Sequence, residues 1–164
     1  MMALYSEAQR QAVLRRAAEA VLARVAGRTA VWVGGYSPTA QKLDLIAGGW
    51  CNRFVRQCFE TALGRRPFSW YFGAARACLT LRKLEKYRVP LAQRQPGDIL
   101  GFPGNPGHIC IYLGRTFDAK KELIAENTSA TRGWPRAPGT KVTAYKTLAG
   151  RVTGCYRLFP TVKK

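Results

Sequence analysis

Acidic side chains and histidine are scarce in this chain. Its 164 residues include 27 lysines and arginines but only 9 aspartates and glutamates, and a single histidine. The formal net charge is therefore +18, which is extreme for this length. Such a field attracts polyanions, so the charge favours nucleic acid, an anionic membrane surface or an anionic bacterial envelope as a partner. The basic residues extend from Arg10 to Lys164 without forming one run, so their order predicts no single binding patch.

The sequence lacks the motifs of several common classes of metal-binding, redox and cofactor-binding proteins. The five cysteines form no CxxC pair, which argues against a zinc ribbon and a thioredoxin-like site. Because five is an odd number, at least one thiol stays unpaired, which favours a reducing compartment during synthesis. No cluster of metal ligands and no phosphate-binding glycine loop is present, so we expect no metal and no organic cofactor. Three cysteines stand among apolar neighbours and are predicted to be small core residues: Cys58, Cys110 and Cys155.

Long apolar runs are also missing. No segment approaches the ~18 apolar residues of a membrane span. The N-terminal segment lacks the continuous apolar region of a secretory signal. Four charged residues interrupt it: Arg15, Arg16, Glu19 and Arg24. We therefore expect a chain that is synthesised in the cytoplasm without a Sec signal and that has no transmembrane segment.

Length and composition predict one folded domain with a sizeable core. The hydrophobic fraction of 47% is ordinary for a globular protein, and we find no internal repeat. Apolar spacing over 6–26 predicts an amphipathic helix. Residues 1–29 would then form an N-terminal helical unit that packs on the main domain, which spans 30–164.

The rest of the chain changes from helical to strand patterns near residue 97. One helix is predicted from Cys51 to the residue before Gly64, and another within 69–87. Strands are predicted at 98–102, 108–113, 123–128 and 151–159. Asp98 is predicted to shape the turn that precedes the first of these strands. N-terminal helices packed on a small antiparallel sheet make an α+β fold.

Cys51 and His108 are the candidate reactive pair. Cys51 begins its helix, where the helix dipole places partial positive charge near the sulfur and where backbone N–H groups without helical partners can bind an oxyanion. His108 begins a strand after a glycine-rich loop, so its ring can project toward that helix end. A cysteine at a helix start and a histidine on a strand are the minimum of a papain-like cysteine hydrolase. The competing interpretation is a structural histidine and an inert buried thiol.

A third polar group is expected on the strand next to His108, where it would accept a hydrogen bond from the second ring nitrogen. Two adjacent residues are candidates, Glu126 and Asn127. Because side chains alternate along a strand, only one of them can share the face of His108. Spacing alone leaves the choice between them open.

The segment PGDILGF…GHICIYLG resembles the central signature of the NlpC-type papain-like peptidases and of the CHAP amidases. Both families have a Gly-Asp turn and a short strand, followed by Gly-His and an apolar strand that ends near Tyr-Leu-Gly. The matching residues are Gly97, Asp98, Gly107, His108, Ile111, Tyr112, Leu113 and Gly114. The Cys51 helix also looks like theirs, and the resemblance covers 36–158.

The surroundings of the reactive pair depart from the NlpC-type pattern in two places. Such members usually have Asp-Cys-Ser-Gly around the nucleophile, whereas this chain has WCNR around Cys51, which is nearer to the looser CHAP pattern. Their third residue, often a histidine, aligns with Asn127, whereas a CHAP-like alignment selects Glu126. We choose Asn127, because an Asn-Thr-Ser run followed by a glycine fits the NlpC spacing, and we keep Glu126 as its competitor.

The resemblance implies a papain-like domain that hydrolyses amide bonds in the peptide stem of bacterial peptidoglycan. Cys51, His108 and Asn127 would be catalytic, and a thioester would be the intermediate. Peptidoglycan and anionic envelope polymers would be its partners, the bacterial cell wall or periplasm its site of action, and nucleic acid is not expected. A phage lysin and a secreted toxin are the kinds of protein that fit this description.

Two other classes of function stay open. A basic nucleic-acid-binding protein would explain the charge, although the sequence has no helix-turn-helix, RNP-like or zinc signature. An acyltransferase or deamidase of the same fold would use the same reactive pair on another substrate.

Overall fold

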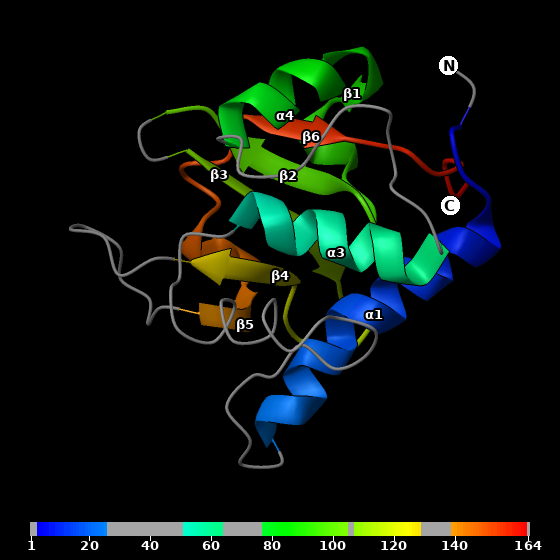
Figure 1. Cartoon of the computed structure of the whole chain (residues 1–164), viewed down its shortest axis with the longest axis vertical. Helices are drawn as coiled ribbons and strands as arrows, with labels where there is room; N and C mark the ends of the chain where they lie inside the picture. The colour runs from blue at the N-terminus through cyan, green and yellow to red at the C-terminus, as the bar shows by residue number, and fades with distance from the viewer. Residues whose placement is uncertain (1–2, 26–50, 64–76, 105–106, 129–138, 164) are drawn as a thin grey trace.

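A computed structural model describes residues 3–25, 51–63, 77–104, 107–128 and 139–163 of the chain (Figure 1). Within these residues, α-helices accompany a small antiparallel sheet of six strands. The predicted α+β class is confirmed.

The helices and strands follow one another in a simple order. The α-helices are α1 (Glu7–Val25), α3 (Cys51–Leu63) and α4 (Ala77–Leu84), and the short 3₁₀ helices are η1 (Glu85–Tyr87), η2 (Leu91–Gln93) and η3 (Tyr145–Thr147). The strands are β1 (Arg88–Val89), β2 (Ile99–Phe102), β3 (His108–Gly114), β4 (Leu123–Thr128), β5 (Gly139–Ala144) and β6 (Gly154–Tyr156). The helix predicted within 69–87 is α4 where the structure describes it, and its portion at 69–76 lies outside the described residues. In the part of the chain that is described, no helix combines the length and the apolar character that a bilayer crossing requires.

The strands lie in the order β1-β6-β2-β3-β4-β5, and every neighbouring pair is antiparallel. β3 lies inside the sheet and is buried along its whole length. Its first residue, His108, pairs with Phe102 at the end of β2. β1 forms one edge of the sheet and is only two residues long, because Pro90 follows it.

Side-chain alternation divides the core into one cluster on each face of the sheet. Ile109 and Ile111 of β3 pack with Phe54 and Phe59 of α3, which lies across the sheet in Figure 1. Leu100, Cys110 and Tyr112 belong to the cluster on the other face, together with Tyr145 of η3. The three cysteines predicted as core residues, Cys58, Cys110 and Cys155, are all buried, which confirms that prediction.

The turn before β2 is held by a buried ion pair. Oδ2 of Asp98 accepts a hydrogen bond from the backbone N–H of Gln95 at 2.8 Å, so Asp98 shapes this turn as predicted. The same carboxylate receives two hydrogen bonds from Arg157, from Nε to Oδ1 at 3.0 Å and from Nη2 to Oδ2 at 2.8 Å. This pair ties the C-terminal segment to the sheet, and no local sequence signal indicated it.

Candidate active site

Three elements that are distant in sequence have one terminus each at the same side of the molecule. Figure 1 shows the N-terminal end of α3, the start of β3 and the end of β4 close to one another. Cys51 is the first residue of α3, and His108 is the first residue of β3. Glu126 and Asn127 lie near the end of β4. The fold therefore brings the sequence-predicted residues into one region.

The buried face of α3 fixes the position of Cys51. Phe54, Val55 and Cys58 are fully buried, and their spacing along the helix places them on the side that packs against the sheet. Cys51 itself retains 9% of its surface accessible. Its place in the first turn puts it beside backbone N–H groups that have no partner within the helix, and near the positive end of the helix dipole.

His108 connects Cys51 to a buried carboxylate. Its side chain interacts with the side chains of Cys51 and Glu126, and it is only 3% exposed. Nε2 of His108 lies 3.4 Å from Oε1 of Glu126, a residue with no accessible surface. The order of contacts is therefore thiol, imidazole and carboxylate.

The charges around His108 outweigh the effect of its burial. Burial lowers the pKa of His108, since it disfavours the charged imidazolium, but hydrogen bonds to Cys51 and Glu126 and the charges of these two groups raise it by more. The net pKa of His108 therefore lies above its ordinary value. The imidazolium form of His108 is therefore favoured at this position.

Glu126 occupies the position next to the imidazole, and Asn127 is its neighbour on β4. Because consecutive residues of a strand project to opposite faces, the Asn127 side chain is directed to the face opposite that of Glu126. Asn127 is fully buried, as Glu126 is. The structure thus brings Glu126, the competitor left open by the sequence, into contact with His108, and a catalytic role for Asn127 stays a prediction.

The β2–β3 pair supports His108 from the other side. The rings of Phe102 and His108 have centroids 5.9 Å apart and planes inclined by 43°. Beside them, a Cβ atom at Gly101 would come within 2.6 Å of the His108 carbonyl oxygen and 2.9 Å of the Leu81 side chain. Glycine at this position therefore permits the close approach of β3 and α4 to β2. Sequence reasoning missed this support, since only strand register places these residues together.

The other features predicted around the reactive pair add little to the geometry of the site. Asn52, the residue after Cys51, is buried. No three His, Cys, Asp or Glu side chains of the described residues form a group that could hold a metal ion. The portions of the family resemblance at 36–50, 64–76, 105–106 and 129–138 lie outside the described residues.

Comparison with protein-family models gives no match to this chain, and a search of curated proteins gives none either. The chemical capability of the site is therefore argued from its geometry. A thiol at a helix N-terminus, an imidazole that interacts with it, and a carboxylate next to the imidazole are a nucleophile, a base and an orienting group.

Proposed function

We propose that the protein is a papain-like cysteine hydrolase that cleaves amide bonds in the peptide stem of bacterial peptidoglycan. The observation that supports this proposal is that His108 interacts with both Cys51, at the N-terminus of α3, and the buried carboxylate of Glu126. The resemblance of the segment around His108 to NlpC-type peptidases and CHAP amidases supports the choice of substrate. The α+β architecture, with a cysteine helix packed on an antiparallel sheet, is compatible with that family.

The first half of the reaction forms a thioester. Nε2 of His108 faces Glu126, so Nδ1 is the nitrogen that takes the thiol proton. The Cys51 thiolate attacks the amide carbonyl, and backbone N–H groups of the first turn of α3 bind the resulting oxyanion. The C–N bond breaks as the imidazolium gives its proton to the leaving amine, which departs and leaves the acyl group on sulfur.

The second half releases the acid. His108 takes a proton from water, and the hydroxide attacks the thioester carbonyl. The C–S bond then breaks, and the thiolate again faces an imidazolium. Glu126 acts in both halves by holding the ring in one tautomer and orientation and by stabilising its positive charge.

The net charge of +18 supports an anionic, polymeric substrate. Bacterial envelopes carry phosphate and carboxylate polymers, so a basic enzyme concentrates on them. If surface charge drives this capture, hydrolysis of whole cell walls falls as ionic strength rises, while hydrolysis of a small soluble stem peptide changes little. Equal salt sensitivity of the two substrates would contradict capture by charge.

Digestion of purified peptidoglycan tests the proposal, with mass spectrometry of the released fragments to identify the bond that is cut. Cys51→Ala and His108→Ala should each lower hydrolysis by about 10³-fold or more, because nucleophile and base act as one unit. Cys78→Ser is the matched control, since Cys78 is a half-buried cysteine of α4. Normal wall clearance by both alanine variants would refute the hydrolase.

Nucleic-acid binding is the second candidate function, and the net charge is the observation that favours it. The Cys51→Ala variant separates the two candidates, because binding through surface charge does not depend on the thiol. Salt-dependent binding of DNA or RNA by this variant, without peptidoglycan hydrolysis by the unmodified protein, would favour the second candidate. Acyl transfer or deamidation by the same three residues would instead appear as a Cys51-dependent product other than a free acid at the peptidoglycan stem.

A further inference from the structure

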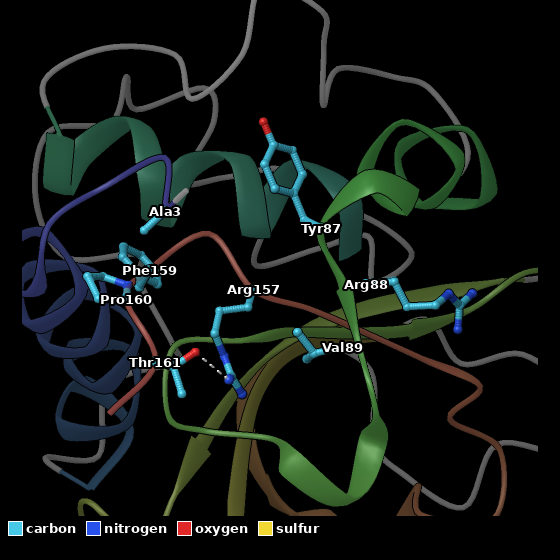
Figure 2. Close-up of a pocket in the computed structure, with 8 residues that line it drawn as sticks. All are labelled: Ala3, Tyr87, Arg88, Val89, Arg157, Phe159, Pro160 and Thr161. Carbon is cyan, nitrogen blue, oxygen red and sulfur yellow. Dashed lines mark hydrogen bonds between the residues drawn. The ribbon is translucent and has the colours of Figure 1, made fainter. Parts of the chain in front are cut away.

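A cavity lies at the β1 edge of the sheet, away from the candidate active site. Its volume is ≈ 470 Å³, and Figure 2 shows the residues around it. They are Ala3, Tyr87, Arg88, Val89, Arg157, Phe159, Pro160 and Thr161. β1 and β3 are three strand positions apart, which corresponds to about 14 Å across the sheet. The cavity is therefore separate from His108.

Two buried guanidinium groups lie near this cavity, and their charges and that of the buried Asp98 carboxylate influence one another. Arg10 is 2% exposed and Arg157 is 6% exposed, and Asp98 is a fully buried acidic group whose charge acts on both. Asp98 receives its ion-pair hydrogen bonds from Arg157. The partner of Arg10 is Glu7, at 2.8 Å, but half of the Glu7 side chain is exposed and its charge is screened by solvent. The buried part of this cluster thus carries an excess of positive charge.

The position of Arg10 brings that excess close to the cavity wall. Its guanidinium lies 5.7 Å from the centroid of the Phe159 ring and donates a hydrogen bond to the carbonyl of Pro160. Both of these residues line the cavity. Burial lowers the pKa of Arg10, and the neighbouring charge of Arg157 acts in the same direction against Glu7 and Asp98. An anion nearby would relieve this repulsion.

Arg157 also keeps a donor for such an anion. A guanidinium has five N–H groups. Arg157 donates from Nε and Nη2 to Asp98, from Nη2 to the Gln93 carbonyl at 2.6 Å, and from Nη1 to Thr161 Oγ1 at 3.2 Å. Within the described residues, the second N–H of Nη1 has no protein acceptor. Figure 2 shows Nη1 and the Thr161 hydroxyl side by side, and both residues line the cavity.

Part of the remaining wall is apolar. Val89, Phe159 and Pro160 contribute carbon surface. Arg88 contributes its stem, because its guanidinium extends away from Arg157 in Figure 2 and is held by Glu85 at 2.5 Å. The cavity therefore offers two hydrogen-bond donors at one place, the Arg157 guanidinium and the Thr161 hydroxyl, and apolar surface in the same wall.

We propose that this cavity binds an oxyanion, a carboxylate or a phosphate, carried on a small apolar body. The Nη1 group of Arg157 and the hydroxyl of Thr161 donate to the oxyanion, and the apolar walls receive the rest of the ligand. The ion pair with Asp98 holds the guanidinium in place before the ligand arrives. This site does not depend on the proposed hydrolase activity.

Titration calorimetry on the full chain at constant ionic strength tests the site with three probes. N-acetylalanine supplies a carboxylate on an apolar body, inorganic phosphate supplies the other oxyanion, and N-acetylalaninamide is the neutral control. We expect saturable binding of at least one anionic probe and none of the amide. The probe that binds identifies which oxyanion the cavity takes.

Two variants locate the binding and one controls for general charge. Thr161→Val removes the hydroxyl at an exposed position and should weaken binding about tenfold. Ala3→Trp should abolish binding by filling the cavity from its exposed rim. Arg82→Gln removes an exposed charge of α4 outside the cavity and should leave binding unchanged. Three results would overturn the proposal. The amide could bind as well as the anions, neither anion could bind, or binding could be unchanged in both Thr161→Val and Ala3→Trp.

Discussion

Nε2 of His108 lies 3.4 Å from a carboxylate oxygen of Glu126, and both side chains are buried. A buried carboxylate is costly unless a cation or a strong donor faces it. The imidazolium form of His108 meets that requirement, and the thiol of Cys51 faces the same ring. The proton on His108 therefore affects both the stability of the fold and the reactivity of the site.

Replacing Glu126 by glutamine keeps its shape and removes its charge. Because the Glu126 carboxylate raises the pKa of His108, Glu126→Gln should lower that pKa and reduce peptidoglycan hydrolysis about 10²-fold or more. His108 is the only histidine, so its proton NMR titration gives its pKa without assignment by mutation. Asn127→Ala is the matched test of the neighbouring residue. A large loss in Asn127→Ala with near-normal activity in Glu126→Gln would assign the third catalytic role to Asn127 instead.

The raised pKa of His108 predicts how stability depends on pH. A group whose pKa is higher in the folded state stabilises the fold fully below its unfolded pKa, about 6.5 for histidine, and this contribution is lost as pH rises through the folded value. The free energy of unfolding of the unmodified protein, relative to that of His108→Gln, should therefore be larger below about pH 6 than near pH 9. Urea unfolding at both pH values measures it. A difference of the opposite sign would show that burial dominates the pKa of His108.

Glycine at position 101 is predicted to be necessary for the position of His108. In Gly101→Ala the new Cβ would meet the His108 carbonyl oxygen at 2.6 Å, so β2 and β3 must separate. We expect a loss of about 1–3 kcal/mol in the free energy of unfolding, together with slower alkylation of Cys51 by iodoacetamide. Gly150→Ala is the matched control, since nothing lies within 4 Å of its added Cβ, and it should change stability by about 0.5 kcal/mol at most. Equal behaviour of the two variants would contradict the close contact.

The ion pair between Asp98 and Arg157 should stabilise the fold strongly. Asp98→Asn leaves a buried guanidinium without its countercharge, and we expect a loss of about 3–5 kcal/mol in chemical denaturation. Asp118→Asn is the control, because among the described residues Asp118 accepts hydrogen bonds only from nearby backbone N–H groups, those of Lys120 and Lys121. It should cost about 1 kcal/mol or less. Similar losses of unfolding free energy in both variants would show that the buried ion pair contributes little to stability.

The helices and strands that the sequence predicted well have a regular apolar pattern, and residues that typically begin or end such elements flank them. The helix predicted over 6–26 is α1, and the helix predicted from Cys51 is α3. The apolar strand predicted at 108–113 is β3, which ends one residue later at Gly114. Two strands were not predicted, β1 and β5. β1 has only two residues, and β5 has the polar sequence GTKVTA, so pairing with β6 and β4, and not their own patterns, makes them strands.

The choice between Glu126 and Asn127 depended on strand register, which the sequence does not contain. Tyr112 pairs with Ile124, but Gly114 pairs with Leu123, so an irregularity between Tyr112 and Gly114 shifts the register. A shift of one residue exchanges the faces of a strand. The ion pair of Asp98 was equally hidden, because its partner is distant in sequence and Arg157 lies in a segment without a distinctive pattern.

The short edge strand β1 affects whether molecules associate through their sheet edges at high local concentration. Within β1, the N–H of Arg88 is already bonded to the Glu85 carbonyl, and the following Pro90 has no N–H. Such an edge offers few donors to an approaching chain, and its charged side chain discourages one. Many copies gathered on a polymer of opposite charge can therefore remain separate there instead of adding strands to one another.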